Sequence, residues 1–378
     1  MSLRLVHLAN FHSTNIGNGA LISGTERVLE EDFGVPITWH REAWDDYTFG
    51  LKSFDAAFVR RINEHDGLVI GGAVAINGRA YLSHTGTRVD LPLELWSELA
   101  KPVIFHGISY RHWAGQPFYH ADRLQALVQL VTQHPRMVLG LRNDGTRGWL
   151  ERLLGTRLPE ERVGTVPDPA QFVRPSGATD FPELCAGRRN VLISFNDEDA
   201  EFRYGTAERR TRVIQGLAET VQQLASEWPA RFILAPHYFD DFRMLAEFVA
   251  ACRPQFAHQQ LVTTGLVKVD AAPWFYARYA RADLALSMRV HSMSPAIGLG
   301  VPVVPVVTQD RMWNYLDDAG LRDLAVDALA DDFPARLHGL ATAALREPGR
   351  LRGRLQAAAA AQREQMRVFN HRLRGLFR

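Results

Sequence analysis

One segment in the second half of the chain constrains the possible fold more than any other. Residues 284–288 form an apolar run with the length of a buried parallel strand, and Arg289 and His291 follow it directly. A helix is predicted to begin near Ser292, and Gly298 closes it before another apolar run. In open α/β sheets, ligands bind at the carboxyl ends of strands, where the next helix offers free N–H groups. The segment therefore predicts an α/β enzyme that holds an anionic small molecule at Arg289 and His291.

The length of 378 residues predicts two domains, because single cores rarely grow beyond roughly 250–300 residues. A hydrophobic content of 46% with 22% charged residues is typical of a folded protein rather than a disordered one. The formal net charge of +1 gives no overall attraction to nucleic acid. Lysine occurs only at positions 52, 101 and 268, so an arginine in this chain needs a positional reason before it is assigned to an anion.

The two cysteines, Cys185 and Cys252, indicate a reducing compartment without disulfide bonds. Residues 1–7 resemble a strand and not a leader peptide, and no apolar run reaches the ~18–20 residues of a membrane span. We therefore expect a cytoplasmic protein. No His, Cys and carboxylate cluster has metal-ligand spacing, so we expect neither a structural metal nor a cofactor.

Strand-length apolar runs alternate with amphipathic helices along both halves, which predicts parallel sheets covered on both faces. In the first half, strands are predicted at 3–8, 36–41, 67–71, 102–105 and 137–141, and helices at 20–33, 54–64, 121–132 and 147–154. In the second half, strands are predicted at 191–195, 232–235, 260–263, 284–288 and 301–307, and helices at 207–226, 239–251 and 273–280. Residues 79–91 break the rhythm and are interpreted as a small hairpin or an active-site flap.

The periodicity fades between residues 175 and 189, which we interpret as a linker between domains. The predicted domains are an N-terminal Rossmann-like domain, 1–174, and a C-terminal one, 190–345. Two such domains that face a central cleft make up the GT-B architecture, and this is the predicted fold.

The remaining residues, 346–378, form a basic helical tail with nine arginines against Glu347 and Glu364. One interpretation is a solvated helical face that docks on the body of the protein. The other is peripheral attraction to an anionic membrane, at its inner face, that carries a lipid-linked acceptor.

Glycines and asparagines follow the first predicted strand. Gly17 and Gly19 allow a ligand to approach the backbone, whereas Asn15 and Asn18 are suited either to bonding sugar hydroxyls or to capping the next helix. The spacing is not the G-x-G-x-x-G of a dinucleotide site, and no acidic residue follows the second strand in the manner that binds a ribose.

Other strand ends carry weaker signals. Gly72 ends the third strand, and His106 ends the fourth. Arg142 ends the fifth and is interpreted either as an anion ligand or as a partner of the nearby Asp144. In the second half, Asp240 and Asp241 are interpreted as helix caps rather than as a catalytic pair.

The motifs in their order along the chain resemble the polysaccharide pyruvyl transferase family. The matching segments, across roughly residues 8 to 310, are 15–20, 71–72, 141–144, the Asp168–Pro169 step in 166–170 and the Arg-x-His step in 288–292. The chain departs from the family in having Asn18 in place of an aspartate, Ala73 in place of a third glycine and Arg311 in place of a lysine.

The resemblance implies a GT-B-like fold and a pyruvyl unit moved from phosphoenolpyruvate onto two saccharide hydroxyls as a ketal. It implies that His291 is the acid or proton shuttle, a role that suits a histidine near neutrality. Arginine forks suit carboxylate and phosphate, and the implied donor ligands are Arg289, Ser292, Arg311 and Arg142. The implied acceptor ligands are Asn15, Gly17, Asn18, Gly72 and His106.

Three alternatives remain open. A glycosyltransferase of the same architecture would bind a nucleotide-sugar at the same helix terminus. A non-catalytic member of a polysaccharide assembly complex would bind a donor without turnover. A third alternative is pyruvyl transfer onto a small molecule that is not a polysaccharide.

Overall fold

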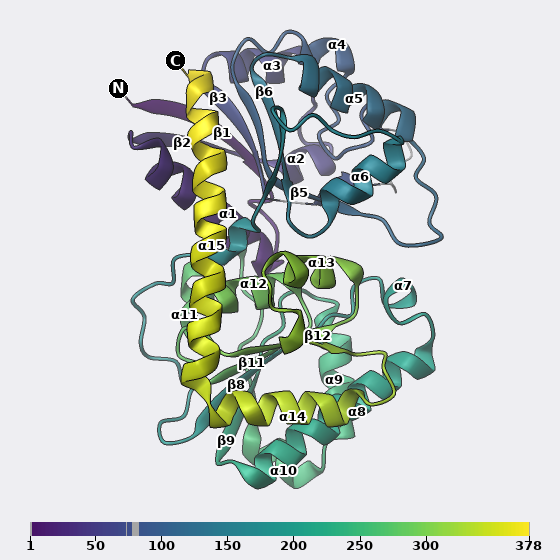
Figure 1. Ribbon diagram of the computed structural model, residues 1–378, viewed down its shortest axis with the longest axis vertical. Coiled ribbons are helices and arrows are strands. Elements are labelled where there is room, and N and C mark those ends of the chain that lie inside the picture. Colours follow the sequence, from purple (N-terminus) through teal and green to yellow (C-terminus); the bar gives the residue numbers. More distant parts are fainter. Residues whose placement is uncertain (1, 73, 78–82, 378) are drawn as a thin grey trace. The chain divides into compact units, whose positions relative to one another are not determined.

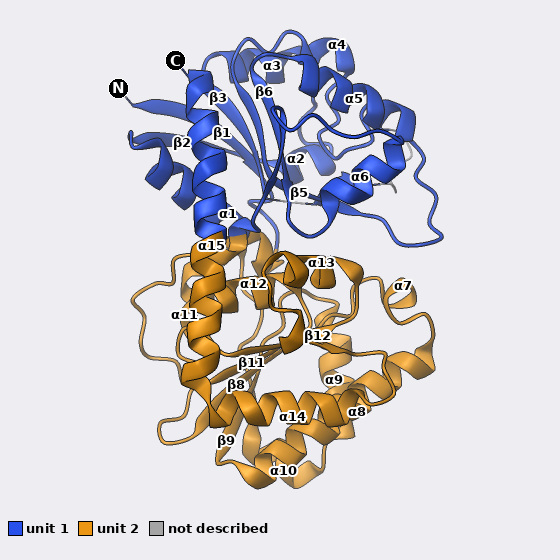
Figure 2. Cartoon of the chain, viewed as in Figure 1, with its two compact units in different colours: residues 1–13, 21–169, 362–378 blue, residues 14–20, 170–361 orange. Residues whose placement is uncertain are grey.

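The chain forms two compact units in a computed structural model that describes residues 2–72, 74–77 and 83–377 (Figure 1). Unit 1 comprises residues 1–13, 21–169 and 362–378, and unit 2 comprises residues 14–20 and 170–361 (Figure 2). The tail that the sequence sets apart, residues 346–378, is formed mostly by one long helix, α15 (Pro348–Arg374). Its residues up to 361 are grouped with unit 2, and the rest are grouped with unit 1.

Unit 1 is built on a parallel sheet of the order β2-β1-β3-β5-β6-β7, and β4 pairs with β5. Its strands are β1 (Leu3–Ala9), β2 (Ile37–Ala43), β3 (Gly67–Gly71), β4 (Val74–Asn77), β5 (Val103–Arg111), β6 (Met137–Arg142) and β7 (Val163–Val166). Its helices are α1 (Ile16–Phe33, from residue 21 on), α2 (Trp44–Thr48), α3 (Ala56–Asn63), α4 (Leu93–Trp96), α5 (Ala121–Gln133) and α6 (Thr146–Leu154). The central strands are buried along nearly their whole length, because helices cover both faces of the sheet.

The last residues of α15 pack on this sheet. A Cβ added at Gly140 or Gly164 would lie 2.8 or 2.6 Å from the ring of Phe369, so the two glycines provide the space in which the ring sits. Oδ1 of the next residue, Asn370, accepts a hydrogen bond from His106 Nε2 at 3.0 Å, and Nδ2 of Asn370 donates to Asp32 at 2.8 Å. The C-terminal segment is therefore part of the core of unit 1.

Unit 2 is built on a parallel sheet of the order β10-β9-β8-β11-β12-β13. Its strands are β8 (Arg189–Ser194), β9 (Ala230–Leu234), β10 (Leu261–Thr263), β11 (Leu284–Ser287), β12 (Val303–Val307) and β13 (Val326–Asp327). Its further helices are α7 (Ala200–Tyr204), α8 (Ala207–Glu227), α9 (Asp241–Ala251), α10 (Pro254–Gln260), α11 (Ala272–Tyr279), α12 (Val290–Gly298), α13 (Asp310–Asp318) and α14 (Phe333–Arg346). The strand order reverses between β8 and β11, and in doubly wound sheets ligands bind outside the carboxyl ends of the strands at such a point.

Every strand predicted from the sequence is present, and the prediction of two Rossmann-like parallel-sheet domains is confirmed. The short strands β4, β7 and β13 were missed, since few residues carry their pattern, and β5 runs on to Arg111 instead of ending at residue 105. Of the predicted hairpin or flap, residues 79–82 lie outside the described residues. The rest is a largely buried loop that Ser83 fixes by bonding to Asp90 at 2.8 Å, with one antiparallel bridge between Ile76 and Thr87.

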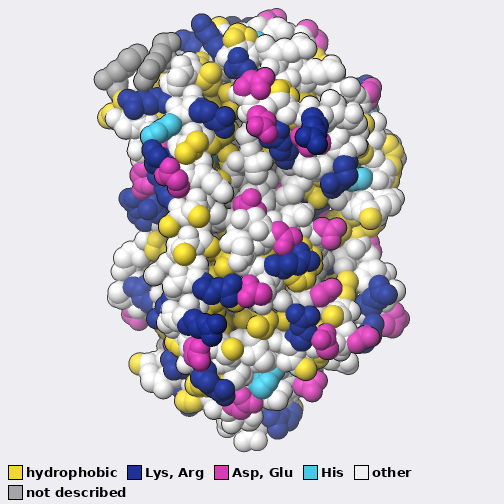
Figure 3. Space-filling model, in the orientation of Figure 1, with side chains coloured by type: hydrophobic (Ala, Val, Ile, Leu, Met, Phe, Trp, Pro, Cys, Tyr) yellow, Lys and Arg dark blue, Asp and Glu magenta, His cyan; other side chains and the backbone are white. Residues whose placement is uncertain are grey.

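Basic and acidic side chains are interspersed on the face of the molecule shown in Figure 3. This mixture agrees with the small net charge and gives no single-sign field on that face for a nucleic acid. Across residues 2–72, 74–77 and 83–377, no helix has the length and apolar character needed to cross a membrane.

Candidate functional site

The site begins where the strand order of unit 2 reverses. Arg289 follows β11 in an extended conformation, with φ −122° and ψ 144°, and stands at the N-cap position of α12. Its Nε donates to the carbonyl oxygen of Phe195, the residue after β8, at 2.9 Å. The side chain therefore joins the carboxyl ends of the two strands at the switch point, beside the positive end of the α12 dipole.

Asp241, at the start of α9, holds the guanidinium of Arg289. Arg289 Nε lies 3.0 Å from Asp241 Oδ2, and Nη2 also donates to this carboxylate. Asp241 Oδ2 accepts the backbone N–H groups of His237 and Tyr238 at 2.8 and 3.1 Å. Burial lowers the pKa of Arg289, but Asp241 and Glu198 outweigh it and raise that pKa above its ordinary value. The arginine therefore keeps its charge although it is only 7% exposed.

Two further arginines lie near the carboxyl ends of the strands of unit 2. Arg203 in α7 is buried, and it donates to Thr308 Oγ1 at 2.8 Å and to the carbonyl oxygen of Glu198 at 3.1 Å. Burial lowers the pKa of Arg203 to about 10, and the charges of Arg289 and Arg311 lower it further. Arg311, near the start of α13, is partly exposed. Arg203 thus bonds to the residue after β12, and Arg289 bonds to the residue after β8, so that positive charge gathers near these strand ends.

His291 lies in the first turn of α12 and is partly exposed. Tyr276 donates its hydroxyl to the carbonyl oxygen of His291 at 2.5 Å. A Cβ added at Gly17 would lie 2.6 Å from His291 Nδ1, so the glycine backbone packs directly on the ring.

Residues 14–20 belong to unit 2, although the sequence places them in the first domain. Ile16 donates its backbone N–H to the carbonyl oxygen of His237 at 3.1 Å, which fixes the first turn of α1 beside α12. Asn15 Oδ1 accepts the backbone N–H of Gly17 at 3.1 Å, as the capping interpretation expects, and the backbone N–H of Asn18 bonds to the carbonyl oxygen of Asn15 at 2.9 Å. The structure thus brings Asn15, Gly17 and Asn18 together with His291.

Ser292 lies behind this surface and is 1% exposed. Its hydroxyl lies 2.8 Å from Ser287 Oγ and 3.0 Å from the hydroxyl of Tyr279, which lies 2.9 Å from His237 Nε2. Burial, followed by the charges of Arg289 and His291, holds the pKa of His237 well below its ordinary value, so this histidine is neutral. The buried chain supports the start of α12 rather than offering its hydroxyls to a ligand.

Two residues expected to bind substrate in the first domain lie inside unit 1. Arg142 is 1% exposed, donates twice to the carbonyl oxygen of Gly107, at 3.2 and 3.1 Å, and lies 3.7 Å from Asp168 and 4.0 Å from Asp144. Arg142 is therefore surrounded by acidic side chains, as its interpretation as a partner of Asp144 expects.

His106 is 0% exposed and is bonded to Asn370, and burial lowers its pKa to about 4. Neither His106 nor Arg142 presents a polar atom at the surface in this conformation, because both side chains point into the core. Gly72 directly follows β3 at the switch point of unit 1, with φ +37° and its N–H bonded to the carbonyl oxygen of His106 at 2.9 Å. Ala73 lies outside the described residues.

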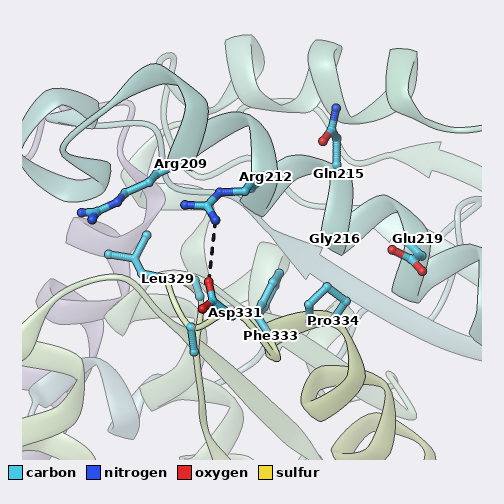
Figure 4. Close-up of a pocket in the computed structure, with 11 residues that line it drawn as sticks. Arg209, Arg212, Gln215, Gly216, Glu219, Leu329, Asp331, Phe333 and Pro334 are labelled. Carbon is cyan, nitrogen blue, oxygen red and sulfur yellow. Dashed lines mark ion pairs between the residues drawn. The ribbon is translucent and has the colours of Figure 1, made fainter.

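A cavity of about 220 Å³ lies elsewhere in unit 2, between α8 and the segment that follows β13 (Figure 4). Arg212 and Asp331 approach each other across it at 3.7 Å, and Phe333 and Pro334 line one side. None of the residues predicted for the site lines this cavity. Among the described residues, no group of His, Cys, Asp and Glu side chains is arranged to hold a metal ion.

Two parallel-sheet units and an arginine-rich strand end place the chain among GT-B-like proteins, and solved structures agree. It superposes on a UDP-N-acetylglucosamine 2-epimerase with a TM-score of 0.57 at 11% identity, over 97% of this chain and 93% of that one. The UDP-GlcNAc 2-epimerase of Methanocaldococcus jannaschii superposes with a TM-score of 0.53 at 12% identity, over 91% of this chain and 93% of that one. The UDP-GlcNAc 2-epimerase of Neisseria meningitidis, bound to UDP-GlcNAc, superposes with a TM-score of 0.52 at 10% identity, over 94% of each chain. At such identities the likeness establishes the fold alone.

The sequence defines the group more closely. The pattern of the polysaccharide pyruvyl transferase family matches residues 15–310, and the chain belongs to this family. A comparison with proteins of curated function found no match. The family resemblance seen in the motifs is thereby confirmed.

Arg203 and Asp241 are functional candidates that the sequence analysis missed. Arg203 lies in the five-residue helix α7 between β8 and α8, which is too short for a periodic pattern to mark it. Asp241 was interpreted as a cap, since its partner Arg289 is 48 positions away. The strand-end rule had already drawn attention to Asp241, and extending it along the connection after β8 would have reached Arg203.

Proposed function

We propose that the protein transfers the pyruvyl unit of phosphoenolpyruvate onto two hydroxyls of a saccharide, with release of phosphate and formation of a ketal. The observation that carries the proposal is the set of three arginines near the strand ends of unit 2 in a member of this family: Arg289 bonds to the residue after β8, Arg203 bonds to the residue after β12, and Arg311 lies near the start of α13. A donor with one carboxylate and one phosphate needs several cationic groups, and arginine forks bind both planar oxyanions.

In the proposed mechanism, His291 supplies a proton to the methylene carbon of the donor. The electrons of the double bond form the new C–H bond, so the methylene carbon becomes a methyl group. The adjacent carbon gains oxocarbenium character, and the first saccharide hydroxyl attacks it. Phosphate then leaves the same carbon, and the second hydroxyl attacks it and closes the ketal. The proton of the first hydroxyl returns to His291, and that of the second passes to the released phosphate. Arg311 and the N-terminus of α12 stabilise the leaving phosphate, and electrostatic stabilisation of this kind is commonly a large part of catalysis.

The roles of the other residues follow from their settings. Asp241 keeps the guanidinium of Arg289 in place, and Ser292 supports α12 from behind. Asn15, Gly17 and Asn18 belong to the donor side in this proposal, because they lie in unit 2 with His291. Gly72 remains a proposed acceptor contact in unit 1, whereas His106 and Arg142 are assigned to the support of the fold.

Calorimetric titration of the purified chain with phosphoenolpyruvate, UDP and GDP tests the donor. The expected result is binding of phosphoenolpyruvate alone, at least ~10-fold weaker in Arg311→Gln, which removes a charged partner. Arg322→Gln is the matched control, because Arg322 is a surface arginine of the same unit that pairs with Asp317. Binding of a nucleotide without phosphoenolpyruvate would overturn the proposal and favour a nucleotide-sugar donor.

A further inference from the structure

An aromatic cluster lies at the carboxyl end of β5 in unit 1. The rings of Tyr110 and Trp149 stack with centroids 4.4 Å apart and 9° between their planes. Phe118 and His112 lie against Trp149 at 5.6 and 5.7 Å, tilted by 55° and 58°. Residues from β5, from the 112–120 loop and from α6 thus converge on one indole ring.

The cluster is polar as well as aromatic, and its hydrogen bonds fix the histidine. His112 Nδ1 accepts from Trp149 Nε1 at 3.4 Å, so the ring carries its proton on Nε2 and donates it to the carbonyl oxygen of Gln116 at 2.7 Å. Gln116 in turn accepts the backbone N–H of Trp113 at 3.1 Å. The loop is therefore held in one conformation without a ligand, which lowers the entropy cost of binding.

The rings are not fully buried. Trp149, Phe118 and His112 are each partly exposed, and the neighbouring Tyr119 is 45% exposed. A deep structural cluster would instead bury these rings, as unit 1 does with Trp44 and Trp96, which are 0% exposed. Beneath the cluster, Ser109 donates to Asp144 at 2.5 Å, so the strand end that carries Tyr110 is anchored to the turn that precedes α6.

We propose that this cluster binds one pyranose ring of a saccharide. A pyranose has an apolar face of C–H groups that packs on aromatic rings, and it has hydroxyls that bond to the polar tips of Tyr, Trp and His. The carboxyl end of a parallel sheet is where α/β proteins place ligands. The inference rests on the proposed function, because a saccharide is the acceptor in that reaction, and it assigns Trp149 as the main contact.

Saturation-transfer NMR with unsubstituted methyl pyranosides tests this inference on the full chain without donor. The wild-type protein is expected to saturate the ring protons of one face of the sugar. Trp149→Ala is expected to weaken binding roughly tenfold, and Trp149→Phe to weaken it less because a ring remains. Trp39→Phe is the matched control: Trp39 is a partly exposed tryptophan of unit 1 that also uses its Nε1, bonded to Glu30 at 2.8 Å.

The outcomes separate the two proposals. No saccharide signal from the wild type, or equal signals from wild type and the folded Trp149→Phe and Trp149→Ala variants, would overturn the saccharide site. If those variants also bind phosphoenolpyruvate normally, the proposed function would remain. A saccharide signal that depends on Trp149, in a protein that fails to bind phosphoenolpyruvate, would support the site and reject the donor.

Discussion

Gly17 packs on the imidazole of His291 so closely that a Cβ at residue 17 would lie 2.6 Å from Nδ1 and 2.7 Å from the Cβ of the histidine. Both residues belong to unit 2, although 274 positions separate them along the chain. A glycine is therefore required here for space and not for an unusual backbone angle. The contact ties the first turn of α1 to the first turn of α12, the helix that begins at the arginine site.

Gly17→Ala is expected to displace the His291 ring and to lower turnover at least ~10-fold, since small misplacements of a catalytic group are costly. Alanine favours a helix by about 1 kcal/mol over glycine, so a simple helix effect would be stabilising. The measurement is the steady-state rate of phosphate release with a saccharide acceptor. Gly177→Ala, where an added Cβ meets nothing within 4 Å, is the control. Equal rates for Gly17→Ala and wild type would contradict the packing argument.

His291→Ala is expected to fold normally and to lose turnover by ~10²–10⁴-fold, because it removes the proposed proton donor. Phosphoenolpyruvate binding, measured by calorimetry, should change much less than the rate. His258→Ala serves as the control, since His258 is an exposed histidine of the same unit. Unchanged turnover in His291→Ala would remove this residue from the mechanism.

Arg289→Met is expected to destabilise unit 2 by about 3–5 kcal/mol, because it leaves the buried carboxylate of Asp241 without its counter-charge. Urea unfolding measures the change. Addition of Asp241→Asn should restore part of the loss, since the uncompensated charge is then absent. Arg322→Met, which breaks an exposed ion pair, should cost no more than about 1 kcal/mol. A small effect of Arg289→Met, equal to that of Arg322→Met, would show that the pair does not hold the site together.

Acid should destabilise unit 1 through His106. Burial lowers its pKa from 6.5 to about 4 in the folded chain, with His7 acting in the same direction and Asn370 and Asp32 against it. The unfolded chain therefore binds the extra proton first. The contribution of neutral His106 to the free energy of unfolding is complete above pH 6.5. It is lost as the pH falls toward 4, by up to about 1.4 kcal/mol per pH unit.

His106→Asn should flatten this part of the pH–stability curve, measured as urea-unfolding midpoints between pH 6.5 and 4. The exposed histidine of the same unit, His84, provides the control variant His84→Asn. Glu26 contributes at lower pH: burial raises its pKa, but bonds from His7 and Arg41 outweigh this and lower it to about 2, so its stabilisation is lost below pH 4.5. An unchanged slope in His106→Asn would assign the acid sensitivity to other groups.

The sequence by itself determined the parallel sheets, the strand ends that carry Arg289 and His291, and the family. These features are local: an apolar run of four to six residues, a helix start and a short motif each lie within one stretch of chain, so composition and spacing reveal them. The same locality explains why strands as short as β13 (Val326–Asp327) were missed.

Only the tertiary structure decided which side chains meet. It paired Arg289 with Asp241 across 48 positions and His106 with Asn370 across 264, and it joined residues 14–20 to the unit that holds His291. It also turned Arg142 and His106 inward, and it made the C-terminal segment part of a core through Phe369. Burial and distant pairing are properties of the packed chain, because they depend on where strands and helices lie in space and not on the residues beside them.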